Sequence, residues 1–193
     1  MRGDQLRDLA RRAANRTGYR QILVLGSQAV HGALPGADLP AITTVSEEAD
    51  LAVVNDVSGE TPHVIEAAFG MGSRYHLSFG VYADGIALSE VALPDGWQGR
   101  LHAEQIADGA DVDNPITVLF PEIHDLCASK LTVAVTGGFG RRSDREFVTA
   151  LAEAGLIDLD LLHDRIGRLP PSVAPEVREA AHAIVHRLGG TDP

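Results

Sequence analysis

A group of acids directly ahead of an apolar segment constrains this chain more than any other feature. From Ser46 to Val54 the sequence reads SEEADLAVV, which places three carboxylates in four positions before residues typical of a buried strand. A carboxylate beside a protein core costs several kcal/mol to desolvate unless it is paired, hydrated or bound to a metal. The fold must therefore supply one of these three conditions.

The composition is that of a globular protein with an acidic surface. The 193 residues, of which 45% are hydrophobic, suit one domain or one domain with a small appended lobe. The net charge is -11, from 16 basic and 27 acidic residues. This balance argues against a general nucleic-acid binder, although a local basic patch is compatible with it.

The chain lacks the marks of a membrane or secreted protein. No stretch approaches the ~20 apolar residues of a membrane span, and the amphipathic first segment does not have the form of a signal peptide. Cys127 is the single cysteine, so an internal disulfide is excluded, and its apolar helix favours a place in the core. We expect a cytoplasmic protein without a membrane partner.

The spacing of apolar and turn residues predicts an α/β half followed by an all-helical half. Asp4 and Gly18 bound the first helix, and a glycine-rich loop separates the two helices that follow Pro121. The expected strands cover 21–26, 50–54, 75–83, 86–93 and 116–120, with 75–83 and 86–93 as a hairpin. The expected helices cover 4–18, 27–34, 59–70, 121–135, 143–155, 159–169 and 174–188. We therefore expect two parts, residues 1–120 and 121–193.

Two elements of the α/β half indicate a phosphate and metal site. Gly26 and Ser27 form a strand-to-helix turn, whose free backbone N–H groups suit phosphate oxygens, although many such turns only begin a helix. Glu48 and Asp50 are two residues apart, so on an extended strand they share one face. A divalent cation would relieve their repulsion, and Mg²⁺ prefers carboxylates together with substrate phosphates. The alternative is that the start of the strand is exposed to solvent and both acids face water.

Polar residues of the helical half admit both structural and functional interpretations. Lys130 stands at the edge of an apolar helix face, where it would neutralise a nucleotide phosphate or extend its ammonium group to solvent. Asp144 fits the first turn of a helix, and Ser143 with Glu146 fits a capping box at its start.

Several other patterns exclude functions or indicate surface residues. Arg141 and Arg142 follow the segment TGGFG, which lacks the lysine and hydroxyl of a Walker loop, so they either bind phosphates or are solvated. The Gly-x-Ser-x-Gly pattern of serine hydrolases is absent. His182 and His186 are four residues apart without a third ligand nearby, which favours a surface pair over a zinc site.

Six segments, taken in order, resemble the nucleotidyltransferase-like family related to AbiEii and MenT toxins, which are minimal relatives of the polymerase-β-like nucleotidyltransferases. They lie between roughly Gln21 and Leu156 and read LVLGSQAVHG, SEEADLAVV, FGVYADGI, ALPDGWQGRL, HDLCASKL and RRSDREFVTAL. The resemblance implies an α+β nucleotidyltransferase-like core with a mixed sheet. It also implies transfer of a nucleoside monophosphate from a nucleoside triphosphate (NTP) to an acceptor hydroxyl, with release of pyrophosphate.

The resemblance also implies roles for the residues of the α/β half. Gly26 and Ser27 match the turn that holds the triphosphate. Ser46, Glu48 and Asp50 match the strand that binds Mg²⁺ or Mn²⁺. Because phosphoryl-type transfer is mainly positioning and charge stabilisation, this set of groups would suffice for it.

In the helical half, Lys130 matches the lysine that offsets negative charge on the nucleotide. Asp144 matches the acid that orients this lysine or helps to position the acceptor hydroxyl. Ser46, Arg141 and Arg142 complete the residues expected to bind the nucleotide.

The resemblance suggests an acceptor and a partner. Toxins that resemble this chain transfer nucleotides to the 3′ end of tRNA, so tRNA is the first expected acceptor and a cognate antitoxin protein an expected partner. RNA would have to contact Arg141, Arg142 or the first helix, at Arg7, Arg11 and Arg12. The alternatives are a protein hydroxyl or an aminoglycoside-like small molecule as acceptor, or a non-catalytic nucleotide-binding or interaction module.

The chain departs from the family's pattern at several positions. Glu48 stands where the wider superfamily usually has aspartate, and Ser143 where a lysine is common. The segment that joins Lys130 to Asp144 is longer than in many related sequences. Asp84 and Glu90 are candidates for a third metal carboxylate, but each is interpreted more simply as a polar residue of the expected hairpin.

Overall fold

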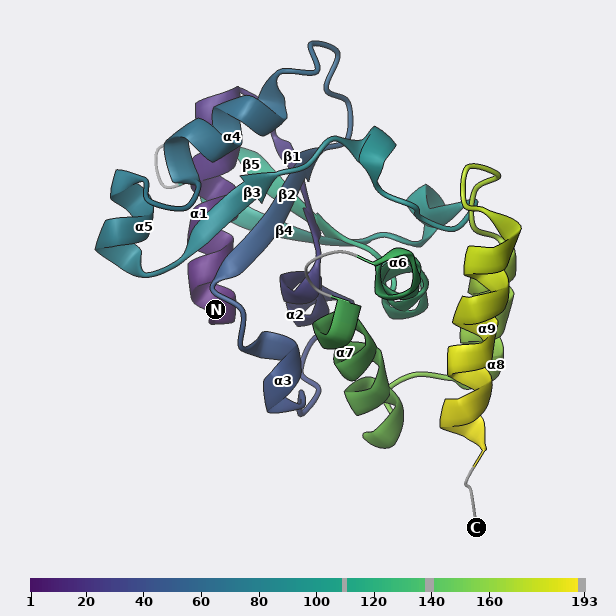
Figure 1. Cartoon of the computed structure of the whole chain (residues 1–193). Coiled ribbons are helices and arrows are strands. Elements are labelled where there is room, and N and C mark those ends of the chain that lie inside the picture. The colour runs from purple at the N-terminus through teal and green to yellow at the C-terminus, as the bar shows by residue number, and fades with distance from the viewer. Residues whose placement is uncertain (109–110, 138–140, 191–193) are drawn as a thin grey trace. The chain divides into compact units, whose positions relative to one another are not determined.

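The computed structural model describes residues 1–108, 111–137 and 141–190, with the side chains of 108, 111–113 and 141 excluded. The chain divides into two compact units (Figure 1), which are described separately. The sheet unit comprises Met1–Ala37, Thr44–Val91 and Leu101–Pro121. The helical unit comprises Asp38–Thr43, Ala92–Arg100 and Glu122–Pro193.

The sheet unit is α+β and contains a five-stranded mixed sheet in the order β3-β2-β1-β5-β4. β1 pairs antiparallel with β2 and parallel with β5, β2 pairs parallel with β3, and β4 pairs antiparallel with β5. The strands are β1 (Gln21–Leu25), β2 (Glu48–Val53), β3 (Tyr82–Gly85), β4 (His102–Asp108) and β5 (Asp111–Phe120). Its helices are α1 (Gly3–Thr17), α2 (Val30–Ala33), α4 (Thr61–Phe69) and α5 (Arg74–Phe79), with 3-10 turns η1 (Ser27–Ala29) and η2 (Leu88–Glu90).

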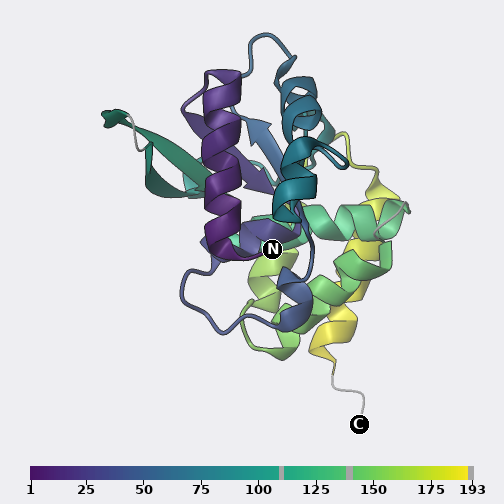
Figure 2. The ribbon, with the colours of Figure 1, turned by 90° about the vertical axis from the view of Figure 1, so that its left-hand side faces the viewer.

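Helix α1 packs against the five-stranded sheet and buries its apolar side chains there. It packs over β1, β4 and β5, and α4 beside it packs over β2 and β3. Figure 2 shows α1 in front of the sheet. The helix ends at Gly18, whose φ of +80° is the left-handed conformation that glycine adopts without strain. Its fully buried positions are Leu6, Leu9, Ala10, Ala13 and Ala14. Their helical spacing confirms the amphipathic helix expected from the sequence.

Strand β2 carries the acid-rich segment, and its burial alternates at the start. Ala49 and Leu51 are fully buried, whereas Glu48 and Asp50 between them are only half-buried. This alternation confirms that the two acids share one face of an extended strand. The other face of the strand, with Ala49 and Leu51, belongs to the core.

Two expectations in the sheet unit are wrong. Residues 75–83 were expected as a strand, but Arg74–Phe79 form α5, because Ser73 accepts the His76 N–H at one end and Gly80 adopts φ +69° at the other. Only Tyr82–Gly85 of this segment are extended, as β3. The expected partner strand at 86–93 contains the turn η2 instead, so β3 is an edge strand and there is no hairpin at this point.

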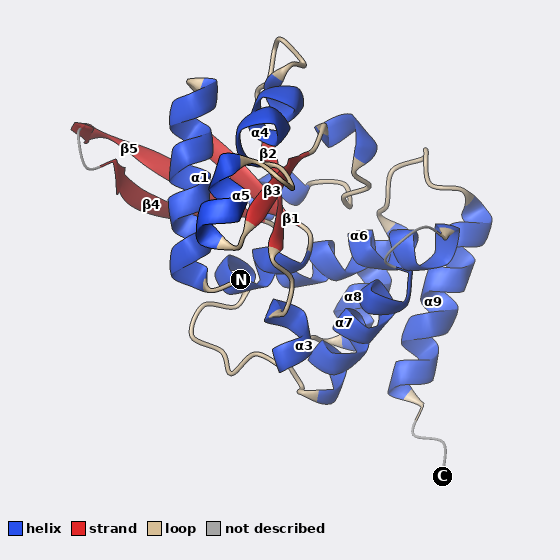
Figure 3. Ribbon diagram, turned by 60° about the vertical axis from the view of Figure 1, so that its left-hand side comes forward, coloured by secondary structure: helices blue, strands red, loops and turns tan. Residues whose placement is uncertain are grey.

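The strands β4 and β5, which follow each other in the chain, pair antiparallel at the opposite edge of the sheet (Figure 3). The segment HAEQIAD of β4 is too polar to show the alternation by which strands are found, so only the apolar end of β5 was expected. The short helix α3 (Ala41–Thr44) likewise lies in a segment expected to be a loop.

The helical unit is built around α6 (Ile123–Thr136), which contacts the three described helices that follow it. These are α7 (Arg141–Glu153), α8 (Leu159–Gly167) and α9 (Pro175–Gly189), and η3 (Trp97–Arg100) precedes them in the chain. Because α7 begins at Arg141, Ser143 lies inside its first turn and does not cap it. The side chain of Glu146 accepts a hydrogen bond from Arg142, so the expected capping box is wrong.

Buried charges of α6 are held by fixed partners. Asp125 is 0% exposed and binds the Arg100 guanidinium through both carboxylate oxygens, at 2.8 and 3.0 Å. Arg165 of α8 approaches the same carboxylate at 3.1 Å. His124 accepts the Asp158 backbone N–H at Nε2, so its proton lies on Nδ1, which is 2.6 Å from Glu122. The hydrogen bond between His124 and Asp158 therefore connects the start of α6 to the start of α8.

Gly32 provides a test of the packing under α2. A Cβ at this position would lie 2.1 Å from the ring of Phe120, which is buried at the end of β5. Alanine normally stabilises a helix by roughly 0.5–1 kcal/mol relative to glycine, but here overpacking should reverse the sign and cost about 1–3 kcal/mol. We expect Gly32→Ala to lower the urea midpoint, whereas Gly167→Ala at the end of α8, where the added Cβ meets open space, should not. A more stable Gly32→Ala protein would contradict this packing.

Candidate functional site

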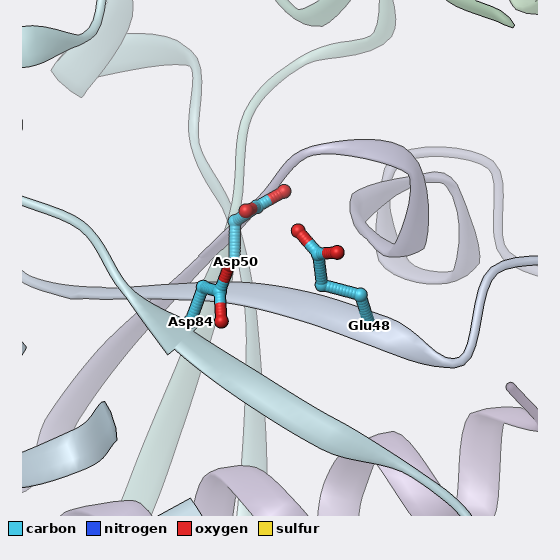
Figure 4. Close-up of side chains that lie close together, drawn as sticks. All are labelled: Glu48, Asp50 and Asp84. Atoms are coloured by element: carbon cyan, nitrogen blue, oxygen red, sulfur yellow. The ribbon is translucent and has the colours of Figure 1, made fainter. Parts of the chain in front are cut away.

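Three carboxylates from two neighbouring strands meet on one face of the sheet. Glu48 and Asp50 project from β2, and Asp84 projects from β3 (Figure 4), where it stands in register with Asp50. One carboxylate oxygen from each residue lies within 4.8 Å of the others, and all three side chains are half-buried. Like charges at this separation repel each other, and the repulsion is stronger near the protein than in bulk water. Three such oxygens fit the ligand preference of a divalent cation such as Mg²⁺.

Gly26, at the end of β1, leaves the space that the Asp50 carboxylate occupies. A Cβ on Gly26 would lie 1.6 Å from Oδ2 of Asp50, and the residue has φ +60°. Both the contact and the backbone conformation therefore require glycine here. Gly26 and Ser27 were expected to hold a triphosphate. The structure shows that Gly26 makes room for Asp50 and that Ser27, which is half-buried, begins the turn η1.

Ser46 fixes the start of β2. Its Oγ accepts the backbone N–H of Glu48 at 3.1 Å and lies 3.3 Å from the Glu48 carbonyl oxygen, to which it can donate. The hydroxyl thus holds the backbone from which the first acid of the cluster projects. This contact gives Ser46 a positioning role that the sequence did not indicate.

Tyr82 is a residue of this site that the sequence reasoning missed. It stands opposite Glu48 in the β2–β3 register, and its hydroxyl donates to Oε2 of Glu48 at 2.8 Å. Burial and the Glu48 carboxylate raise the pKa of Tyr82, so the phenol remains a hydrogen-bond donor at neutral pH. The available signal was its spacing, because Tyr82 and Asp84 are two residues apart on an extended segment.

Asp84 carries an electrostatic cost in the folded protein. Burial raises its pKa, and the negative charges of Glu48 and Glu66 raise it further. A bound cation would stabilise the charged form and displace a proton where one is bound. Asp84 is thus the third carboxylate that the sequence left open, whereas the other candidate, Glu90, is exposed in η2 and lies outside this cluster.

The two expected site residues of the helical half contact each other. Nζ of Lys130 on α6 lies 2.5 Å from Oδ1 of Asp144 on α7 and 4.7 Å from the ring centroid of Phe147. Lys130 is only 8% exposed, so its ammonium group is not extended to solvent. Asp144 occupies the first turn of α7, as expected.

The arginines expected to contact a nucleotide or RNA are mostly paired. Arg142, whose side chain is 92% exposed, binds Glu146 on α7, and the side chain of Arg141 lies outside the described residues. On α1, Arg7 binds Glu104, while Arg11 and Arg12 both bind Asp8. Two carboxylates therefore offset two of the three positive charges of these α1 arginines.

Comparison with known proteins finds no family model, curated protein or solved structure that matches this chain. Among the described residues, the helices are too short or too polar to cross a membrane.

The Gly26–Asp50 contact can be tested by cation binding. We expect Gly26→Ala to displace the Asp50 carboxylate and to raise the Kd for Mn²⁺ at least about tenfold, measured by calorimetry. Gly36→Ala is the matched control, because Gly36 also has a positive φ, of +79°, but an added Cβ there meets nothing within 4 Å. Equal Mn²⁺ affinity in the two variants would show that Gly26 does not shape a cation site.

The Tyr82–Glu48 hydrogen bond predicts a second effect. Tyr82→Phe removes the donor that orients Glu48, and the loss of such a partner of a metal ligand typically costs about 10–100-fold in metal affinity. We expect a loss in this range for Mn²⁺, with an unchanged free energy of unfolding in the absence of metal to within about 1 kcal/mol. Tyr75→Phe, which removes a hydroxyl near Asp8 on another part of the sheet unit, should bind Mn²⁺ like the unsubstituted chain.

Proposed function

We propose that this chain is a metal-dependent nucleotidyltransferase, which transfers a nucleoside monophosphate from an NTP to an acceptor hydroxyl and releases pyrophosphate. The observation that carries the proposal is the arrival of Asp84 from β3 beside Glu48 and Asp50 of β2. Exposure of the start of β2 to solvent would explain the two acids Glu48 and Asp50. It would not explain a third acid that a separate strand brings next to them. The resemblance in sequence supplies the reaction type.

Mg²⁺ or Mn²⁺ held by these acids would neutralise charge on the triphosphate and activate the attacking hydroxyl. The protein's own groups prepare the site. Asp50 is accommodated by Gly26, the Glu48 backbone is held by Ser46, and the Glu48 carboxylate is oriented by Tyr82. Glu48 and Asp50 are therefore each positioned by neighbouring residues, as the ligands of catalytic metal sites require.

Lys130 and Asp144 enter the proposal through the resemblance. Their ion pair and the Phe147 ring fix the ammonium group in one place within the helical unit. In the proposed reaction Lys130 offsets charge on the nucleotide and Asp144 orients Lys130. The proposed contacts of the nucleotide are Gly26, Ser27, Ser46, Arg141 and Arg142.

For the acceptor we propose the 3′ end of cytoplasmic tRNA, with the chain acting as the toxin of a toxin–antitoxin pair. The composition and the paired arginines of α1 favour a second candidate, a protein hydroxyl or an aminoglycoside-like small molecule. Both would require less positive surface than tRNA does.

The reaction can be tested with α-labelled NTPs, Mg²⁺ or Mn²⁺, and three acceptors in parallel: total tRNA, a protein extract and an aminoglycoside. We expect label on one acceptor, and we expect Asp50→Asn and Asp84→Asn to reduce the labelling to background while remaining folded. Glu90→Gln, on η2 outside the cluster, is the matched control and should remain active.

The position of the label distinguishes the reaction type. Transfer from γ-labelled but not from α-labelled NTP would indicate a kinase and overturn the proposal. Nucleotide binding without transfer to any acceptor would identify a non-catalytic module. Full activity in both aspartate variants would place the chemistry elsewhere.

A further inference from the structure

A histidine pair connects α8 and α9, which pack against each other in the helical unit. Nδ1 of His163 on α8 lies 2.7 Å from Nδ1 of His182 on α9. The two rings are nearly parallel, with an interplanar angle of 16° and centroids 5.0 Å apart. His182, which the sequence grouped with His186 as a surface pair, is therefore half-buried against another helix.

The distance between the two nitrogens identifies the interaction. At 2.7 Å one Nδ1 must carry a proton and donate it to the lone pair of the other. A zinc ion binds each nitrogen at about 2.0–2.1 Å, so tetrahedral ligands lie roughly 3.4 Å apart and would not fit this contact. The only group of three or more ligand-type residues within the described ranges is the acidic cluster of the sheet unit, so this pair lacks a third ligand. The contact is a hydrogen bond.

Such a bond exists only while at least one ring is neutral. When both rings are neutral, or when only one is protonated, an N–H donor of one ring faces the nitrogen lone pair of the other. With both rings protonated, two N–H groups and two positive charges face each other at a distance too short for either. The second proton therefore opposes the packing of α8 on α9.

The charged groups around the pair do not remove this conflict. Along the two helices the charged or titratable neighbours within one turn are Asp160, Asp164 and Arg165 on α8 and Arg178, Glu179 and His186 on α9. Asp164 binds Arg165 and Arg168. On α6, which packs against both helices, His124 binds Glu122 and Asp158, Asp125 binds Arg100, and Lys130 binds Asp144. Glu179, three residues before His182, is exposed and would stabilise one protonated ring more readily than two.

We propose that His163 and His182 form an acid-sensitive latch, which holds α9 on α8 while the two rings share a hydrogen bond and releases it when both are protonated. The inference does not depend on the proposed enzymatic reaction, because it concerns only contacts within the helical unit.

The direction of the pH effect follows from linkage. Burial and the charge of His163 lower the pKa of His182 from its ordinary value of 6.5. The unfolded α8–α9 segment therefore binds more protons than the folded one at pH values below about 6.5, so its stability is complete above this pH and declines as the pH falls. The loss reaches at most about tenfold in the closed-to-open ratio per pH unit for each proton involved.

Hydrogen exchange of the intact chain, read by mass spectrometry and expressed as protection factors, tests the latch locally. A local measurement is needed because His31 in the sheet unit also has a pKa lowered by burial. Between pH 7.5 and 5.5 we expect protection in α8 and α9 to fall about tenfold, with a smaller change in α1. His182→Gln should abolish this acid-dependent loss. His163→Gln should also abolish it, and it serves as the test if His182→Gln folds poorly.

The matched control is His186→Gln, one turn further along α9 on its exposed side, which should retain the full acid-dependent loss. Nitrogen-15 NMR of the imidazoles at pH 7.5 should show one ring of the pair with its proton on Nδ1 and the other with its proton on Nε2. Unchanged protection at pH 5.5 in the unsubstituted chain would overturn the proposal. So would an acid-dependent loss that persists in both His163→Gln and His182→Gln.

Discussion

The register of β2 against its two neighbours decides where the charge of the sheet unit lies. Leu25 of β1 and Asp84 of β3 both stand opposite Asp50, one on each side of the strand. A slip of one residue would turn Glu48 and Asp50 toward the core and Leu51 away from it, because side chains alternate along a strand. The buried face thus fixes the register, and the register brings three acids together.

The part of this site that follows from local periodicity was predictable, and the part that follows from strand pairing was not. Glu48 and Asp50 share a face because they are two residues apart. Asp84 joins them because β3 pairs in register with β2. This pairing was not predictable, because the pattern of the preceding segment indicated a strand where the structure has the capped helix α5. Tyr82 was missed for the same reason. In the helical unit the sequence pattern at Ser143 suggested a cap, but the actual start at Arg141 left that residue inside the helix.

The helical unit compensates its buried polar groups pair by pair. Asp125 has the Arg100 fork, and Lys130 has Asp144 and an aromatic ring. Each of these pairs is complete in one protonation state, because an acid faces a base of opposite charge. His163 and His182 differ, since two identical groups form a bond that one further proton abolishes. The same kind of interhelical contact therefore makes one pair permanent and the other dependent on pH.

Comparison of the half-buried Asp84 with the buried Asp125 bears on the meaning of the acidic cluster. Burial and Glu122 raise the pKa of Asp125, but Arg100 and Arg165 act in the opposite direction, so the fold compensates part of this cost from within. For Asp84 burial, Glu48 and Glu66 all raise the pKa. An asparagine at this position would keep the shape of the side chain and remove the repulsion. A third acid lowers the stability of the metal-free protein, and it becomes favourable only when a cation or a proton binds there. Residues that cost stability in this way are expected at functional sites, which favours cation binding over a purely structural role for the cluster.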